Sequence, residues 1–451
     1  MRVGIDFGTS NSSAAVYEGG RSSLIPLDPG PRNPAVMRTL LYLGRDGCRL
    51  VGKQALDTYH AQNIGRTTRL ARVQIGVIQN TFAEVGTTYT DIFVWVDENE
   101  PGRLFQSLKT ALRDASYRGT SVYGKGYSLE QLIAELLSEL RERIERERGE
   151  LIDRAVFGRP VRYSDDAVED AAAEHRMRTA CELAGFKDVT LLEEPVGAAL
   201  SYGATVTGGN RVLVFDFGGG TLDVTVMELE PGNRYRVLAT GGTPIGGDAL
   251  DRRIMQRKLL KQFGVENSMG TKGLVLPARV SDLLLSWQTI PQLNAPSNRS
   301  MLDMLQAQRV GPAARRFRAL ECLITRNYGL PLFEAIEAAK VRLSFEDRTR
   351  LEFVAEAIVL DELMLRAEFD VMIADDVRKI SQCVDDTLLA SGLTADQIDA
   401  VIRTGGSSAI PIFVRMLANR FGADKVREHS VFTGVTEGLA IAAANLPHAV
   451  E

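Results

Sequence analysis

The sequence predicts an α/β protein built from two related lobes, and three observations support this prediction. The chain of 451 residues is too long for one ordinary core, so two or more domains are expected. A strand, a glycine turn and a returning strand occur near the N-terminus and again in the middle of the chain, both times with the sequence Asp-Phe-Gly. Between and after these two segments, strands alternate with helices, as in α/β folds. A plan that occurs twice indicates two lobes of similar architecture.

The two glycine hairpins are predicted from runs of apolar residues that a turn interrupts. The first has its strand, turn and returning strand at residues 2–7, 8–11 and 12–17, and the second at 211–217, 218–221 and 222–229. Aligning the two hairpins places Asp6 and Asp216 at corresponding strand ends. The same chemistry is therefore expected at both strand ends.

The remaining elements follow from the periodicity of apolar residues. Residues 129–148 have a helical repeat, and the charged run 141–148 at their end is interpreted as a solvated helix face. The other predicted elements are a strand at 151–157, a helix at 165–184, a strand at 189–192, a helix from 246 to 263, a mainly helical region to 344, a long helix at 363–390, a strand at 399–403, a helix from 410 and a final helix at 435–445.

Composition and charge exclude several classes of protein. With 45% hydrophobic and 25% charged residues, the chain is expected to be globular and soluble. A net charge of -5 gives no electrostatic reason for a nucleic-acid or anionic-membrane partner. No apolar run reaches about 18 residues and no signal peptide precedes the first strand, so no membrane span is expected. The cysteines are scattered without disulfide or zinc spacing, which fits a reducing, cytoplasmic location: Cys48, Cys181, Cys322 and Cys383.

Three glycine turns are candidates for phosphate binding, because glycine lets backbone N–H groups approach an anion closely. Each follows an apolar strand: Gly8-Thr9-Ser10-Asn11, Gly218-Gly219-Gly220-Thr221 and Gly405-Gly406-Ser407-Ser408. Asp6 and Asp216 precede the first two turns, where carboxylates can hold the waters around Mg²⁺. The alternative, in which each aspartate only caps its turn, stays open. No G-x-x-x-x-G-K-[ST] motif is present, which disfavours a P-loop enzyme.

These residues resemble the heat-shock chaperone family of DnaK type, and through it the actin and sugar-kinase superfamily. The resemblance covers nearly the whole chain and is most specific at residues 215–224. Other similar segments are 5–12, 193–203, Gly246-Gly247-Asp248 and Gly405-Gly406-Ser407. The resemblance implies the actin-like ATPase fold, in which two duplicated ribonuclease-H-like lobes flank a nucleotide cleft, with ATP or ADP and Mg²⁺ as ligands.

The resemblance also implies a domain organisation. Lobe I is expected at residues 1–195, with the C-terminal segment 430–451 packing back on it, and lobe II at 196–429. A helical subdomain at about 264–345 elaborates lobe II. The chain ends soon after Asn445 without the β-rich peptide-binding domain of the family, and this layout resembles its YegD-like branch.

Site residues are implied by the family's motifs. Asp6 and Asp216 are expected to hold hydrated Mg²⁺. Lys109 is expected to reach the transferred phosphate, and Glu194 to orient the attacking water. The residues expected to bind nucleotide are Gly8, Thr9, Ser10, Asn11, Gly218, Gly219, Gly220, Thr221, Gly246, Gly247, Asp248, Glu337, Lys340, Val341, Ser344, Gly405, Gly406, Ser407 and Ala409.

Three positions depart from the family's motifs. Val341 and Ala409 stand where the resemblance implies arginines that contact adenine, and Arg342 is the candidate replacement for the first. The affinity for the base and its identity are therefore open. Val168 stands where the resemblance implies an arginine that acts with the proline matched by Pro160 to link nucleotide binding to the peptide domain. The coupling is expected to be altered.

The predicted function is Mg²⁺-dependent binding and slow hydrolysis of ATP by a chaperone-like protein, whose lobe closure signals to a protein partner. A pseudo-ATPase that binds nucleotide without hydrolysis is one alternative. An actin-like filament or scaffold is another, and a small-molecule kinase acting on a sugar is a third, although no additional base for a kinase is evident.

Overall fold

The computed structural model describes residues 1–28, 33–82, 86–114, 116–164, 166–204, 210–230, 234–266, 276–295, 298–307, 313–428 and 433–445. The chain divides into two compact units. Unit 1 comprises Met1–Tyr59, Arg103–Leu250 and Ile373–Glu451, and unit 2 comprises His60–Gly102 and Asp251–Met372. The lobe boundaries at 195 and 429 stay predictions. Parts of the predicted helical subdomain (267–275, 296–297 and 308–312) and of the C-terminal segment (430–432 and 446–451) lie outside the described residues.

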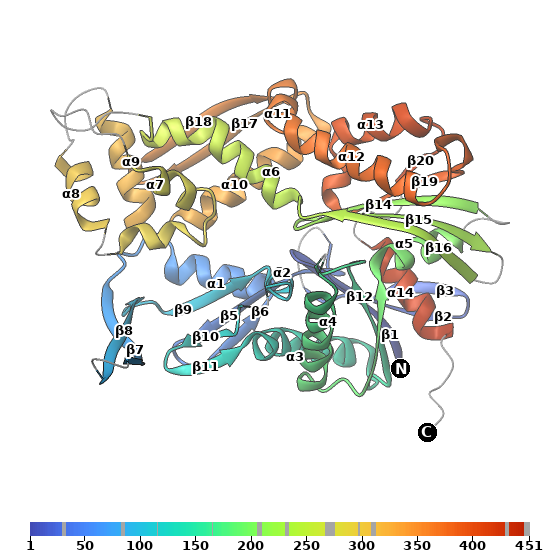
Figure 1. Cartoon of the computed structure of the whole chain (residues 1–451), viewed down its shortest axis with the longest axis horizontal. Helices are drawn as coiled ribbons and strands as arrows, with labels where there is room; N and C mark the ends of the chain where they lie inside the picture. Colours follow the sequence, from blue (N-terminus) through green and yellow to red (C-terminus); the bar gives the residue numbers. More distant parts are fainter. Residues whose placement is uncertain are drawn as a thin grey trace. The chain divides into compact units, whose positions relative to one another are not determined.

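Unit 1 contains two mixed sheets (Figure 1). The first has the strand order β13-β12-β1-β2-β3, with β4 beside β2; its strands are β1 (Arg2–Phe7), β2 (Asn11–Glu18), β3 (Arg21–Leu24), β4 (Val36–Arg38), β12 (Arg154–Arg159) and β13 (Asp188–Glu193). The second has the order β20-β19-β14-β15-β16; its strands are β14 (Asn210–Phe217), β15 (Leu222–Glu230), β16 (Arg234–Thr243), β19 (Ala400–Thr404) and β20 (Val426–Glu428).

The two sheets follow one plan. In the first, β1 pairs antiparallel with β2 and parallel with β12. In the second, β14 pairs antiparallel with β15 and parallel with β19. The outer strands correspond as well, because β13 and β20 run parallel to their neighbours whereas β3 and β16 run antiparallel. The α/β fold with duplicated sheets, predicted from the repeated hairpins, is therefore confirmed.

Helices cover these sheets and end where the sequence provides caps. The first sheet carries α3 (Leu129–Arg148) and α4 (Ala167–Leu183), whereas the second carries α12 (Ala374–Ala390) and α13 (Pro411–Phe421). Ser128 begins α3 with a capping box to Gln131, and Gly149 ends it in a left-handed conformation with φ of 67°. The apolar stripe of α3 is buried in the core of the first sheet, as its periodicity predicted.

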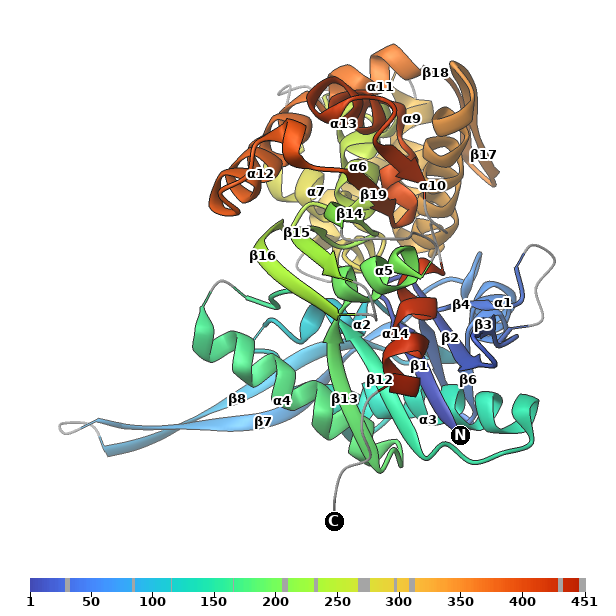
Figure 2. The ribbon, with the colours of Figure 1, turned by 90° about the vertical axis from the view of Figure 1, so that its right-hand side faces the viewer.

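Two helices pack together in the core that joins the sheets of unit 1. They are α5 (Glu194–Gly203) and α14 (Gly434–Asn445), and Figure 2 shows them side by side. Their core cluster combines Val196 and Leu439 with Val214 of the second sheet and Val156 of the first. The helices approach so closely that a methyl group on Gly438 would collide with the α5 backbone. This packing fixes the start of α5.

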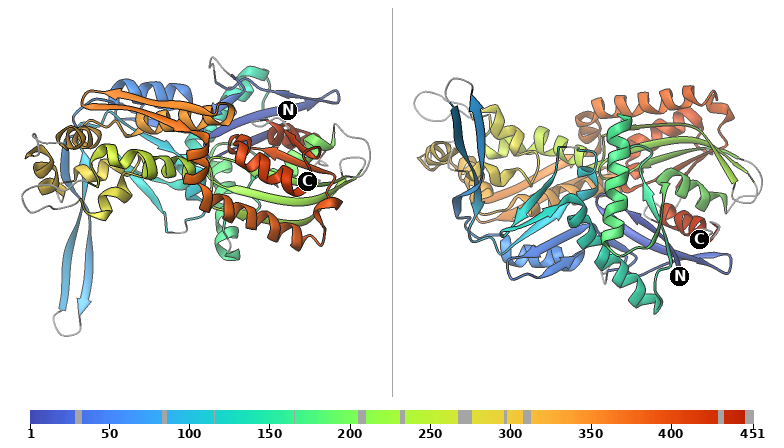
Figure 3. Two further views of the ribbon diagram at one scale, coloured as in Figure 1. Left: turned by 90° about the horizontal axis from the view of Figure 1, so that it is seen from above. Right: turned by 60° about the horizontal axis from the view of Figure 1, so that its bottom comes forward.

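Unit 2 is built from helices and two antiparallel hairpins. Its helices are α7 (Ala278–Leu283), α8 (Arg299–Ala307), α9 (Ala314–Thr325), α10 (Gly329–Phe345) and α11 (Arg366–Met372). The hairpin of β17 (Arg348–Ala355) and β18 (Ile358–Leu365) packs against α9 and α10. The hairpin of β7 (Leu70–Phe82) and β8 (Gly86–Asp97) extends beyond the helices of its unit in Figure 3. No described helix is long and apolar enough to cross a bilayer.

The prediction of one long helix at 363–390 is wrong. Residues 358–365 form β18, and the helical stretch that follows is broken at Ile373 between α11 and α12. Buried and exposed positions alternate along β18, with Ile358, Leu360 and Met364 buried on one face. This period of two is the signature of a half-buried strand, and pairing with β17 decided the outcome over helical propensity.

Candidate nucleotide-binding site

The first two glycine turns have the same backbone geometry. The N–H of Gly8 donates to the carbonyl of Asn11 (3.0 Å), and the N–H of Gly218 donates to that of Thr221 (3.1 Å). Each bond closes a turn between strands of one hairpin. The backbone amides at the tips are thus presented at the ends of β1 and β14, as expected of a phosphate-binding turn.

These two turns lie against each other in unit 1. A methyl group on Gly219 would collide with the Ser10 hydroxyl, and one on Gly220 would lie 3.1 Å from Thr9 Oγ1. A methyl group at either place would displace a hydroxyl of the first turn, so glycine allows these hydroxyls to stay where they are. The two hairpins therefore meet at one place, which is the arrangement that a shared phosphate chain requires.

The two later loops pack on the second turn. At the start of α6 (Gly247–Ile254), the N–H of Gly247 donates to Gly218 O (3.0 Å) and the N–H of Asp248 donates to Gly219 O (2.9 Å). A methyl group on Gly246 would collide with the turn backbone. From the other loop, Ser407 Oγ donates to Gly218 O at 3.0 Å. The structure thus brings the predicted residues of both loops to the second turn.

Gly405 requires its glycine for two reasons. Its φ of 78° lies in the left-handed region, and a methyl group there would collide with the backbone of Phe217. The short helix Gly406–Ala409 that follows contains Ala409. Beneath it, Arg403 Nη1 donates to Ser408 O at 2.8 Å. The loop is thereby held from both sides.

Asp6 and Asp216 face the same group of charges. Burial raises the pKa of Asp6 to about 7, with Glu194 adding to the rise and Lys109 opposing it. Burial also raises the pKa of Asp216 well above its usual range, and Glu194, Asp223 and Asp6 add to this rise. Each carboxylate is half-buried, and among the described residues Lys109 is the cation that opposes the rise in its pKa.

Asp223 is a third carboxylate that the sequence analysis did not assign to the site. It is 7% exposed, accepts a hydrogen bond from Thr221 Oγ1 (3.2 Å), and burial raises its pKa to about 7. In the hairpin register it stands directly opposite Asp216. Two carboxylates in a cross-strand pair repel each other, so the register of the predicted hairpin was a signal for this residue.

Lys109 and Glu194 form an ion pair at the site. Lys109 lies on the short helix α2 (Leu108–Ala111), which follows Ser107 in a left-handed conformation with φ of 58°. Burial lowers the pKa of Lys109, but Glu194, Tyr163 and Asp6 more than reverse this effect, so the ammonium stays charged. The strained Ser107 backbone so close to a buried cation is typical of a functional position.

The position of Glu194 depends on its surroundings in the first sheet. It begins α5 immediately after β13, with Pro195 in the first turn of the helix. The neighbouring strand β12 makes room for it, because a methyl group on Gly158 would lie 2.9 Å from Glu194 Cγ. The resemblance implies that Glu194 orients the attacking water and that Lys109 reaches the transferred phosphate.

Thr110 is a further candidate that the sequence did not reveal. Its Oγ1 would lie 3.5 Å from a methyl group on Gly220, so its hydroxyl reaches the second turn from the side of α2. In the sequence, the only indication that Thr110 could belong to the site was its position directly after Lys109.

The residues of α10 that are predicted to bind adenine lie in unit 2. Glu337 and Ser344 are half-buried on α10, and Val341 is 49% exposed. The Lys340 ammonium is buried in an ion pair with Asp251 Oδ2 at 2.7 Å. Because α10 belongs to unit 2, the part of these residues in the nucleotide site stays a prediction.

Arg342, the candidate replacement for the missing arginine, is engaged elsewhere. Its Nε donates to Thr349 Oγ1 (2.7 Å) and its Nη2 to Arg350 O (2.8 Å), both on β17. Its guanidinium therefore stabilises the junction of α10 and β17.

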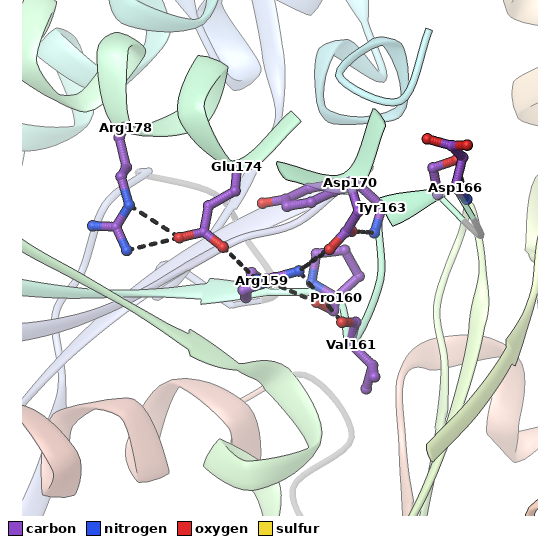
Figure 4. A network of polar contacts seen from close by, with 9 residues as sticks. Arg159, Pro160, Val161, Tyr163, Asp166, Asp170, Glu174 and Arg178 are labelled. Atoms are coloured by element: carbon purple, nitrogen blue, oxygen red, sulfur yellow. Dashed lines mark hydrogen bonds and ion pairs between the residues drawn. The ribbon is translucent and has the colours of Figure 1, made fainter. Parts of the chain in front are cut away.

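Arg159, the last residue of β12, forms a cluster of ion pairs with acidic residues of α4 (Figure 4). Arg159 binds Asp170 at 3.2 Å and Glu174 at 2.5 Å, both on α4. Val168, where the resemblance implies an arginine, is 78% exposed. The positive charge beside Pro160 is therefore supplied by the preceding residue.

The donor set fits a hydrated Mg²⁺ ion. The site contains Asp6, Asp216, Asp223 and Glu194, and two of these carboxylates end equivalent strands. Among the described residues, Lys109 is the cation whose charge opposes the rise in the pKa of the three aspartates. Carboxylates that hold an ion through its waters are the usual magnesium ligands. Among the described residues, no group of three or more His, Cys, Asp or Glu side chains is arranged to hold a metal directly. Water-mediated binding by Asp6 and Asp216 stays a prediction.

Comparisons with known proteins find one family over most of the chain. A family model described as Hsp70 protein matches residues 2–273 and 326–449. The chain is 30% identical over 454 aligned positions to the chaperone protein DnaK of Thermus thermophilus, covering 98% of this chain and 60% of the relative. It is 26% identical to the chaperone protein dnaK of Cyanidioschyzon merolae, covering 98% and 61%. The chain thus spans about 60% of the length of the curated relatives it matches.

Proposed function

Because the chain belongs to the Hsp70 protein family, we propose that it binds ATP with Mg²⁺, hydrolyses it slowly and signals its nucleotide state to a protein partner. The observation that carries the proposal is the contact of the two glycine turns beside the Lys109–Glu194 ion pair. A phosphate chain and its cation need this combination of backbone donors, hydroxyls, a buried ammonium and carboxylates.

Each group has a defined task in this proposal. Amides of the two turns and the hydroxyls of Thr9 and Ser10 hold the phosphate oxygens. Mg²⁺, when bound, supplies positive charge to the phosphates. Asp6 and Asp216 hold its water shell, and its positive charge offsets the burial and the carboxylate repulsion that raise their pKa values.

Hydrolysis requires the ion pair to separate. Lys109 turns its ammonium to the transferred phosphate, and Glu194 becomes free to accept a proton from the attacking water and orient it. Phosphoryl transfer needs little covalent help from the protein, so this positioning accounts for most of the rate. An ion pair that must open before each turnover is consistent with a slow ATPase.

Calorimetry and single-turnover hydrolysis test the proposal. The purified protein should bind ATP in the presence of Mg²⁺, and absence of binding would refute the nucleotide function. Glu194→Gln should slow hydrolysis by about 10²- to 10³-fold and leave ATP affinity within a few-fold. Glu193→Ala, at the same strand end, is the matched control and should hydrolyse ATP at the wild-type rate. Normal turnover by Glu194→Gln would contradict the assignment.

A protein partner is expected, because closure of the lobes around nucleotide transmits a signal only if another protein binds the open and closed states differently. We place the protein in the cytoplasm, since its four cysteines are all unpaired. Affinity capture with ATP and with ADP should retain a protein in only one of the two states. Equal retention in both states would contradict nucleotide-dependent signalling.

A further inference from the structure

Tyr163 lies beside the site but has no role in the function proposed so far. It follows β12 and Pro160, and it is 8% exposed. Its ring belongs to the core cluster that also contains Leu108 and Leu112, which flank Lys109 in the chain. The same core therefore supports Tyr163 and the segment that carries Lys109.

Two contacts hold Tyr163, one at its backbone and one at its ring. Its backbone N–H donates to Asp170 Oδ1 at 2.6 Å, and the Arg159 guanidinium lies 5.3 Å from the ring centroid. Arg159 is itself held by Asp170 and Glu174, as Figure 4 shows. A ring held in this way cannot turn its hydroxyl to solvent.

The hydroxyl of Tyr163 has no hydrogen-bond partner among the described residues, although its oxygen is fully buried. Buried hydroxyls in proteins nearly always have a partner, and an exception calls for an explanation. Pure packing does not supply one, because phenylalanine would fill the same space without burying an unsatisfied polar atom.

The charged groups around this hydroxyl are the Lys109–Glu194 ion pair and Arg159. Burial raises the pKa of Tyr163, Lys109 opposes this rise, and Glu194 adds to it. The phenol therefore stays neutral and can accept a hydrogen bond from a cation. In the structure the ammonium of Lys109 is bound to Glu194, which leaves two of its three hydrogens for other acceptors.

We propose that Tyr163 is a positioning residue for Lys109, whose ammonium donates to the Tyr163 hydroxyl when its ion pair with Glu194 opens. This inference rests on the proposed ATPase function. The hydroxyl then replaces one carboxylate contact of the ammonium, which lowers the cost of separating two charges in a poorly solvated site. Lys109 is held toward the phosphate, and Glu194 is released to the water.

Tyr163→Phe tests this inference, because it removes one oxygen and keeps the ring. The rate of single-turnover ATP hydrolysis should fall about 10-fold, the value of one hydrogen bond to a charged group. The dissociation constant for Mg²⁺-ATP should change less than twofold, and the melting temperature should not fall. Tyr117→Phe is the control, because Tyr117 packs against the same core but has Arg103 and Arg176 rather than Lys109 as charged neighbours.

Three results would overturn the inference. Unchanged turnover by Tyr163→Phe, in a wild-type protein that hydrolyses ATP, would overturn it alone and leave the proposed function intact. A parallel loss of ATP affinity and melting temperature would show that the hydroxyl only stabilises the fold. Absence of hydrolysis by the wild-type protein would overturn the inference together with the proposed ATPase activity.

Discussion

Asp6→Asn is expected to stabilise the nucleotide-free protein while weakening its response to Mg²⁺-ATP. In the folded protein, burial and Glu194 raise the pKa of Asp6 from 3.8 to about 7. At about 1.4 kcal/mol per pKa unit, the ionised carboxylate costs the fold up to about 4 kcal/mol at pH 8. The side chain is half-buried and its charge is coupled to Glu194 and Lys109, so we expect a gain of about 2 kcal/mol for the asparagine variant.

The pH dependence of this effect has a defined sign. Between about pH 4 and pH 7 the folded protein holds the Asp6 proton and the unfolded chain has released it, so stability falls as the pH rises through this window. Asp6→Asn removes this contribution. The pH slope should therefore become smaller, and it should not vanish because burial also raises the pKa values of Asp216 and Asp223.

Urea unfolding at pH 5 and pH 8, with metal chelated, measures both effects. The variant should be more stable than the wild type at pH 8. Its advantage should be less than half as large at pH 5, where the unfolded chain has already released the proton but the folded protein still holds it. Addition of Mg²⁺-ATP should then stabilise the wild type more than the variant, because the stability that a ligand adds increases with the logarithm of its affinity. Asp386→Asn, exposed on α12, is the control and should leave the pH slope unchanged. Lower stability of Asp6→Asn at pH 8, with an unchanged slope, would refute the reasoning.

Two glycine substitutions separate binding from folding. The new methyl group of Gly219→Ala collides with the hydroxyl of Ser10, which can rotate away, so the free energy of unfolding should change by less than about 1 kcal/mol. The affinity for ATP, measured by calorimetry, should fall at least about 10-fold. Normal affinity would contradict the phosphate role of the turn. Gly438→Ala meets the backbone of Gly197, so it should destabilise the protein by about 1–3 kcal/mol in urea unfolding. Gly126→Ala is the control for this second change, because a methyl group there meets nothing within 4 Å; equal stability of the two variants would contradict the close packing of α5 and α14.

Local signals in the sequence were sufficient for the elements that carry the two phosphate turns. The strand, glycine turn and returning strand of each hairpin depend on residues close in the chain, so β1, β14 and their turns were predictable within a residue. The helix 129–148 was equally local, because its capping box and its apolar stripe lie within it. By contrast, the end of β18 (363–365) was predicted as helix, and the β7–β8 hairpin was not predicted, since pairing with a partner strand decides such segments.

The sequence by itself determined which residue types stand at the strand ends, namely the two aspartates and the glycines that follow them. Only the tertiary structure decided which other groups join them. Lys109 and Glu194 are separated by 85 positions. Their ion pair forms because α2 packs into the core of the first sheet and α5 begins directly after β13 of the same sheet. The buried hydroxyl of Tyr163 acquired its significance in the same way. Burial and charge proximity are properties of the packed chain, so no local pattern encodes them.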